Sequence, residues 1–291
     1  MVFDLMKDAA ERIIVAAHRG ECGGNIPCNT LAAYEIAVRH GADMIEVDLN
    51  KSADGTLWIF HPKMEYNHLN YLGTEGKMFI PQLTDEEIRK LRYVNVDREY
   101  TQFGLCTFDE VLDAFKGRCY INVDKFWDHP REISDAIRAH GMLDQIVVKS
   151  SPKKEIVDLI EEYAPEVNYM PIVKTDDGIH ESMMRRKIHY IGCEVVFTDE
   201  TTGVGSVDFI DKLHADNKLV WANAIIYHYR SQLSAGHSDD TAFTVSPDYG
   251  WGWLADRGYD ILQTDWTLAM CRYLNETGKR YKAQGKGKQN F

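Results

Sequence analysis

Short apolar segments alternate with longer amphipathic segments along the chain. The apolar segments are rich in β-branched residues and lack strict polar alternation, which is typical of strands buried on both faces. They lie at residues 13–17, 44–49, 119–123, 145–148, 168–173, 193–197, 219–223 and 260–264. Most are followed by a segment with helical spacing; Leu31, Tyr34, Ala37 and Val38 are one example. The pattern therefore predicts eight strands, most of them followed by a helix.

Helix-start signals support this alternation. Thr84 and Glu87 have the spacing of a capping box, and Ser151-Pro152 provides a cap followed by proline at the first helical position. We expect helices at residues 30–40, 84 onward, 108–115, 131–140, 151 onward, 179–187, 206–216 and 267–277. Eight such units predict an α/β fold, a (β/α)8 TIM barrel. The rival is a doubly wound open sheet, which is weakened because no G-x-G-x-x-G motif follows the first strand.

The pattern also predicts the domain organisation. Residues 1–282 form a single catalytic domain, because α/β barrels of this length are commonly one unit. Residues 62–82 are irregular and rich in Gly, Tyr and Asn, which indicates a small insertion after the second strand. Residues 283–291 interleave Gly and Lys and are expected to be a flexible tail.

Composition narrows the class of partner. A net charge of -12 argues against nucleic acid or an anionic membrane as the main partner. No segment is apolar enough for a membrane span, and the first residues lack the basic and apolar regions of an export signal. The six cysteines form no C-x-x-C pair, which is typical of reduced thiols. We therefore expect a cytoplasmic protein with a small-molecule partner; the oligomeric state stays open.

Carboxylates at strand ends give the strongest chemical signal. Glu46 and Asp48 lie two residues apart on one strand, so their side chains share a face. Asp124 ends the third strand, and the strand ends of a barrel converge on one mouth. Each carboxylate alone could be structural, but three together predict a site for one divalent cation, Mg²⁺ or Ca²⁺.

Two histidines also end apolar segments beside these carboxylates. His18 follows the first strand, and His61 follows a short run at 57–60. Each could be a core histidine, but a pair can supply a general acid and a general base across one scissile bond. Arg19 offers a planar fork for a phosphate or a carboxylate, although an ordinary salt bridge is the alternative. Which histidine is the acid stays open.

Taken together, these residues resemble the glycerophosphodiester phosphodiesterase family, over residues 12–270. The resemblance is carried by His18-Arg19-Gly20, Asn29-Thr30, Gly41-Ala42-Asp43, Ile45-Glu46-Val47-Asp48, Asp54-Gly55, His61, Thr107-Phe108-Asp109-Glu110, Asn122-Val123-Asp124, Trp221-Ala222-Asn223 and Gln263-Thr264-Asp265. It implies a barrel enzyme that hydrolyses small phosphodiesters with a divalent cation. It also implies catalytic roles for both histidines and metal-ligand roles for Glu46, Asp48 and Asp124.

The chain departs from the family pattern at several positions. Cys28 and Pro62 stand where Glu and Asp are usual, and Asp124-Lys125 replaces the usual Glu-x-Lys. Strand alternation predicts that Lys125 points away from the barrel axis unless the strand bulges. Lys149, at the end of the fourth strand, is the expected replacement for the missing phosphate-binding charge.

Aromatic residues in the second half raise the question of substrate. Most are expected to pack in the core. Trp221 and the Trp251-Gly252-Trp253 loop could instead bind a sugar or a polyol. Three functions therefore remain open. The protein could hydrolyse a small phosphodiester, it could be a phosphodiester lyase that stops at a cyclic phosphate, or it could bind a ligand without catalysis.

Overall fold

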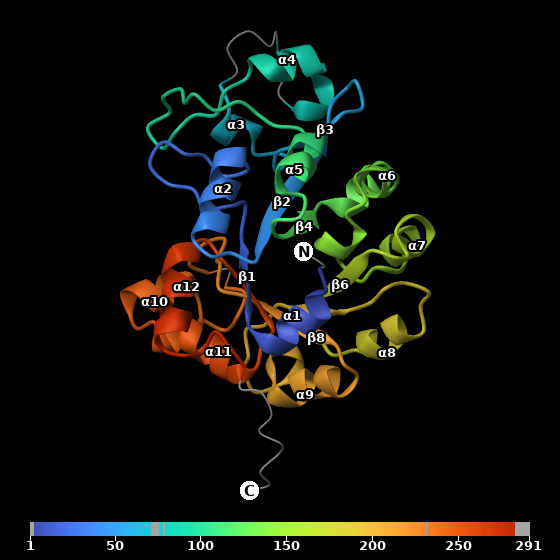
Figure 1. Ribbon diagram of the computed structural model, residues 1–291, viewed down its shortest axis with the longest axis vertical. Helices are drawn as coiled ribbons and strands as arrows, with labels where there is room; N and C mark the ends of the chain where they lie inside the picture. Colours follow the sequence, from blue (N-terminus) through green and yellow to red (C-terminus); the bar gives the residue numbers. More distant parts are fainter. Residues whose placement is uncertain (1–2, 71–75, 78, 231, 283–291) are drawn as a thin grey trace, which may run out of the picture.

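A closed barrel of parallel strands forms the centre of the molecule (Figure 1). The computed structural model describes residues 3–70, 76–77, 79–230 and 232–282. In this part of the chain, the eight barrel strands are β1 (Ile14–Ala17), β2 (Met44–Lys51), β4 (Tyr120–Asp124), β5 (Ile146–Ser150), β6 (Asn168–Val173), β7 (Gly192–Val195), β8 (Leu219–Asn223) and β9 (Ile261–Thr264). β1 pairs with both β2 and β9, which closes the barrel. The predicted (β/α)8 barrel is confirmed.

Helices surround the barrel and cover its outer face (Figure 1). Each turns an apolar face inward; α5, for example, buries Phe108, Val111, Leu112 and Phe115. The helices that follow barrel strands or lie between them are α2 (Leu31–Arg39), α5 (Phe108–Phe115), α6 (Pro130–His140), α7 (Lys154–Tyr163), α8 (Ile179–Met184), α9 (Val207–Ala215), α10 (Asp239–Thr244), α11 (Trp253–Arg257) and α12 (Thr267–Glu276). None of the described helices is both long and apolar enough to cross a lipid bilayer.

The N-terminal end of the barrel is filled with apolar side chains. Helix α1 (Leu5–Glu11) contributes Leu5 and Ala9 to a buried cluster inside the barrel. This cluster also contains Ile14, Met44, Tyr120, Val147, Met170, Ile191, Leu219, Trp221 and Ile261. Because this end is filled, polar groups that converge inside the barrel do so at the opposite, C-terminal end.

A long excursion between β2 and β4 covers part of that C-terminal end. It begins with β3 (Leu57–Ile59), which pairs antiparallel with the end of β2, and continues through α3 (Glu65–His68), η1 (Ile80–Gln82) and α4 (Asp85–Lys90). Its own apolar cluster comprises Trp58, Phe60, Leu69, Ile80, Leu83, Ile88, Leu91, Tyr93 and Leu105. The predicted insertion at 62–82 falls within this excursion, and its residues 71–75 and 78 lie outside the described residues, as does the predicted tail at 283–291.

Candidate active site

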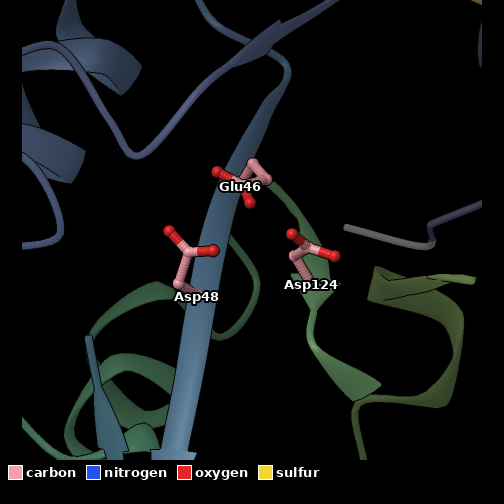
Figure 2. A group of neighbouring side chains, drawn as sticks. All are labelled: Glu46, Asp48 and Asp124. Carbon is pink, nitrogen blue, oxygen red and sulfur yellow. The ribbon is translucent and has the colours of Figure 1, made fainter. Parts of the chain in front are cut away.

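Three carboxylates converge at the C-terminal ends of β2 and β4. Glu46 and Asp48 point from β2 toward Asp124 on β4, as Figure 2 shows. The strand register places Asp48 directly opposite Asp124. One oxygen from each side chain lies within 4.8 Å of the others. The structure thus brings together the two carboxylates that strand alternation placed on one face and the third, Asp124, that the convergence of strand ends placed beside them.

The charges of these carboxylates are only partly balanced. Burial and the negative charge of Asp48 raise the pKa of Glu46 to about 7. Burial opposes ionisation of Asp124 as well, but the charges of Lys125 and Lys149 outweigh it and lower the pKa of that carboxyl. Asp48 is fully buried, and its Oδ1 has no hydrogen-bond partner. Lys125 Nζ lies 3.9 Å from that oxygen, and His61 Nε2 lies 4.0 Å from it.

These residues fit a hard divalent cation. Carboxylate oxygens are the ligands that Mg²⁺ and Ca²⁺ prefer. Three ionised carboxylates carry enough negative charge to balance one divalent cation. A buried carboxylate oxygen that lacks a partner is costly unless a cation is bound beside it. The orphaned Oδ1 of Asp48, on a carboxylate that clusters with Glu46 and Asp124, is therefore the feature that best matches a metal ligand.

The two histidines flank this cluster and are held differently. His18 follows β1, and its Nδ1 lies 2.7 Å from Asp265 Oδ1. Burial favours a neutral His18, but the hydrogen bond to Asp265 and the charge of Glu46 raise its pKa. His61 follows β3, and its Nδ1 lies 2.9 Å from the Pro62 carbonyl oxygen. Because a carbonyl can only accept, Nδ1 carries the proton and Nε2 is left as the free acceptor of the neutral ring.

The pKa of His61 moves in the opposite direction. Burial lowers it, and the positive charges of Arg19 and Lys125 lower it further, against the attraction of Asp48. The surroundings therefore favour a protonated His18 and a neutral His61. Opposite shifts of this kind suit a pair that divides acid and base roles.

Arg19 lines the site and has a left-handed backbone conformation, which is uncommon for a residue other than glycine. It adopts a left-handed φ of 57°, so its own N–H donates to Glu46 Oε2 at 2.8 Å. Its Nε lies 2.9 Å from Asp48 Oδ2. Gly20 follows with φ of 79°, and a Cβ there would lie 2.7 Å from the backbone of Ala33. A glycine at position 20 is thus needed to turn the chain beside the carboxylates.

Lys125 corrects one prediction. Strand alternation pointed its side chain away from the barrel axis, but Lys125 leaves β4 with a left-handed φ of 60°. This turn brings Nζ to 2.5 Å from Asp124 Oδ2, inside the site. The chain therefore supplies a lysine beside the carboxylates one position earlier than the Glu-x-Lys pattern does.

Lys149 lies deeper in the mouth than expected and is already paired. It is 4% exposed, and its Nζ lies 2.7 Å from Glu194 Oε2 and 3.4 Å from Gln263 Oε1. The same ammonium lies 3.9 Å from the ring centre of Trp221. Its charge is therefore balanced by Glu194, an acid on β7 that the sequence prediction did not include.

The predicted aromatic platform is not at the site surface. Trp221 is fully buried in the barrel interior and does not line the mouth cavity. Trp251 is 2% exposed, and Trp253 stacks on His237 with ring centres 3.7 Å apart. The aromatic side chain that lines the cavity is Tyr227, which is 67% exposed. These tryptophans pack in the fold, and Tyr227 is an exposed aromatic side chain at the cavity.

All of the predicted site residues except Trp221 line one cavity of about 440 Å³ or, for Asp48, lie buried in its wall. The lining residues are His18, Arg19, Glu46, His61, Met64, Asp124, Lys125, Lys149, Ile172, Glu194, Asn223, Ile225, Ile226, Tyr227 and Gln263. The carboxylates come from β2 and β4, and the histidines follow β1 and β3, whereas Glu194, Asn223 and Gln263 come from β7, β8 and β9. Isoleucines and Tyr227 line the same cavity.

Several partners of the site were missed from sequence. Asp265 was named only within the Gln263-Thr264-Asp265 motif, although it holds His18. Asn29 donates from Nδ2 to Asp48 Oδ2 at 2.9 Å, while Tyr34 donates to Asn29 Oδ1. Glu194 had a detectable signal, because it is a lone carboxylate inside an apolar strand. The contacts of Asp265 and Asn29 had none, since both depend on the folded chain.

Comparison with known proteins supports the family assignment drawn from the motifs. The chain is 39% identical over 80 residues to a glycerophosphodiester phosphodiesterase from Caldanaerobacter subterraneus, 28% of this chain and 30% of the relative. It is 27% identical over 167 residues to one from Bacillus subtilis, 50% of this chain and 55% of the relative. A third, from Bacillus altitudinis, is 26% identical over 219 residues, 71% of this chain and 83% of the relative. The alignments thus span less than two thirds of the first two relatives.

Solved structures agree on the fold. A glycerophosphoryl diester phosphodiesterase from Parabacteroides distasonis superposes with a TM-score of 0.77 at 18% identity, over 97% of this chain and 93% of that one. An Oleispira antarctica phosphodiesterase, in complex with the product sn-glycerol-3-phosphate, superposes with a TM-score of 0.65 at 18% identity, over 91% and 97%. Residues 169–274 match the model of a domain of unknown function, DUF4996. This match covers β6 to β9, which form the second half of the barrel.

Proposed function

We propose that this divergent relative of the glycerophosphodiester phosphodiesterases hydrolyses a small phosphodiester to a phosphomonoester and an alcohol. The observation that carries the proposal is the convergence of three carboxylates and two oppositely shifted histidines in one cavity. The product complex of the Oleispira antarctica phosphodiesterase supports a glycerol-phosphate type of ligand in a barrel of this kind.

Glu46, Asp48 and Asp124 would hold one divalent cation, Mg²⁺ or Ca²⁺. A bound cation would supply positive charge that offsets the charge of the phosphate. The chain's own cations, Arg19 and Lys125, line the cavity beside Asp48 and Asp124 and can donate hydrogen bonds to the non-bridging oxygens. Such bonds strengthen as charge develops on phosphorus in the transition state.

The histidines account for the proton transfers. A neutral His61, with Nε2 as its free acceptor, would take the proton from the attacking water. A protonated His18, held by Asp265, would give a proton to the departing alkoxide as the bond from phosphorus to the leaving oxygen breaks. One water is consumed, and the two histidines exchange protons with solvent to restore the starting state.

The part of the cavity wall around Glu194 suits a hydroxyl-rich alcohol group. Asn223 donates to Glu194 Oε1 at 2.7 Å, and Lys149 balances the charge of Glu194, so this group of side chains carries no excess charge. A neutral set of donors and acceptors matches hydroxyls better than it matches a second phosphate. Tyr227 at the rim offers a flat surface for a sugar or polyol ring. A sugar or polyol phosphodiester is therefore the proposed substrate class.

The test is a panel of diesters with protein stripped of metal by chelation. Glycerophosphocholine, glycerophosphoinositol and a glycerophosphohexose would each be offered without metal, with Mg²⁺ and with Ca²⁺. Phosphorus NMR separates a monoester product from a cyclic phosphate, and so distinguishes hydrolysis from lyase chemistry. We expect a cation-dependent monoester, with the polyol diesters turned over fastest. Equal turnover by the His61→Ala variant, or no turnover of any diester with either metal, would overturn the proposal.

A further inference from the structure

A buried carboxylate outside the cavity reaches the site through one backbone amide. Asp239 is the first residue of α10 and is 3% exposed. Its Oδ2 accepts the backbone N–H of Asp265 at 2.8 Å. Its Oδ1 accepts from the indole of Trp251 and from the hydroxyl of Thr264, both at 2.7 Å. One carboxylate thus ties α10 and the Trp251 segment to the end of β9.

The residue that Asp239 holds is the partner of His18. Asp265 lies just past β9, and its side chain is 46% exposed. An exposed carboxylate has many rotamers open to it, so its orientation depends on how firmly its backbone is fixed. Asp239 binds that backbone, and Asp265 Oδ1 meets His18 Nδ1 at 2.7 Å. The chain of contacts therefore runs from the buried Asp239 through the Asp265 peptide to the imidazole.

We infer that Asp239 is a positioning residue for catalysis, which sets the orientation of His18 by fixing the backbone of Asp265. Its three donors come from an indole, a hydroxyl and a peptide, so the carboxylate is held in one rotamer. A misplaced proton donor lowers the rate even when the substrate still binds. The kinetic part of this assignment rests on the proposed hydrolysis in the same cavity; the structural part does not.

Asp239→Asn tests the link with the smallest change. The asparagine side chain has only one oxygen that can accept hydrogen bonds. We expect this oxygen to face Trp251 and Thr264, because they provide two donors, whereas the Asp265 backbone provides one. The NH2 group then faces the Asp265 N–H, so that bond is lost while the side chain keeps its volume. Asp260→Asn is the matched control. Asp260 is 3% exposed and also accepts a backbone N–H, from Val220 at 2.8 Å, but it lies just before β9 at the opposite end of the barrel.

The kinetic result separates positioning from general destabilisation. We expect Asp239→Asn to lower kcat by about 10- to 100-fold with KM within about 2-fold, and Asp260→Asn to leave both within about 2-fold. Asp265→Asn should lower kcat at least as much. In the double variant, Asp239→Asn should add less than about 2-fold to the loss caused by Asp265→Asn, because the two act through one contact. Independent, multiplying losses would overturn the inference.

Crystal structures of the same variants give a readout without turnover. In Asp239→Asn, we expect the Asp265 carboxylate to leave His18, while in Asp260→Asn the contact should persist. If Asp239→Asn does not fold, Trp251→Phe loosens the same carboxylate by removing one donor, and we expect a smaller fall in kcat at constant KM. Retention of the Asp265–His18 contact in Asp239→Asn, or unchanged kcat in Trp251→Phe, would overturn the inference. A wild-type protein that turns over no diester would instead count against the proposed function, and the structures would still decide this assignment.

Discussion

The two ends of the barrel both carry buried carboxylates, but they balance the charge differently. At the filled N-terminal end, Asp43 accepts the Val15 N–H at 2.9 Å and pairs with Arg12 and Arg280. Asp260 at the same end likewise combines a backbone N–H with a lysine and a histidine. At the mouth, Glu46, Asp48 and Asp124 crowd together, and one oxygen of Asp48 has no hydrogen-bond partner.

This difference in pairing indicates that the carboxylates at the N-terminal end stabilise the fold, whereas those at the mouth are positioned to bind a ligand. In barrels of this type, the C-terminal end of the strands carries the active site and the N-terminal end contributes stability. Residues kept for function are commonly retained at a cost in stability. Asp43 comes directly before β2, and Asp48 lies within β2, so the two kinds of carboxylate can be compared five residues apart in the sequence.

The largest expected effect is on activity. Asp48→Asn keeps the side-chain shape but removes a carboxylate from the cluster, so we expect kcat/KM to fall by at least about 1000-fold, or about 4 kcal/mol of transition-state stabilisation. Asp43→Asn should keep kcat/KM within about 3-fold, because Asp43 does not line the cavity and lies at the opposite end of the barrel. Steady-state kinetics on the best diester of the panel provide the comparison. Comparable losses in the two variants would remove the distinction between the two ends.

Stability should show the opposite order. Asp43→Asn removes the carboxylate that balances the charge of the buried Arg280 and should lower the free energy of unfolding by about 3 kcal/mol. Asp48→Asn loses a contact with Arg19 but relieves repulsion from Glu46, so metal-free protein should change by less than about 1 kcal/mol. Urea unfolding in the presence of chelator measures both. If Asp48→Asn is the more destabilised variant, its carboxylate is structural.

The pH dependence of stability tests the strain in the cluster. Glu46 has a folded pKa of about 7 against a usual value of 4.5, so its protonated form is favoured by folding. The stability gained in this way is complete below pH 4.5 and is lost as the pH rises through 7. In the presence of chelator, the free energy of unfolding of Glu46→Gln, relative to that of the wild type, should therefore increase between pH 5 and pH 8 by an amount on the order of 2 kcal/mol. Urea unfolding at several pH values provides the test, and a constant difference would contradict it.

The smallest expected effect is stabilisation by the cation itself. Millimolar Mg²⁺ or Ca²⁺ should raise the Tm of the wild type by roughly 2–6 °C, because a ligand that binds only the folded state stabilises it. Asp43→Asn should keep this rise, while Asp48→Asn should lose it. Differential scanning fluorimetry in matched ionic strength distinguishes specific binding from screening. A rise that persists in Asp48→Asn would assign the effect to another part of the surface.

The barrel and the carboxylate cluster could be predicted because both follow from strand periodicity. Alternation alone places Glu46 and Asp48 on one face, and strand ends converge in any barrel. Periodicity could not place Lys125, since a single left-handed residue reverses its direction. It also could not pair His18 with Asp265, which are 247 positions apart.

The prediction for Trp221 failed for a related reason. A residue near the end of a barrel strand can point into the mouth or into the filled interior, and Trp221 does the latter, beneath Lys149. Its height along the strand depends on the stagger of the barrel, which the sequence does not reveal. The contact of Lys149 with Glu194 could not be predicted either, because Glu194 lies on another strand. The phosphate-binding role of Lys149 stays a prediction.

The most direct test of the central claim, that the mouth carboxylates form a cation site, is anomalous diffraction from crystals soaked in Mn²⁺. Manganese accepts the same oxygen ligands as Mg²⁺ and can be located by its own signal. We predict one strong peak bounded by oxygens of Glu46, Asp48 and Asp124, and its loss in Glu46→Gln crystals soaked in parallel. Wild-type crystals without a peak among these three carboxylates, or with the main peak beside Asp43 or Asp260, would contradict the account.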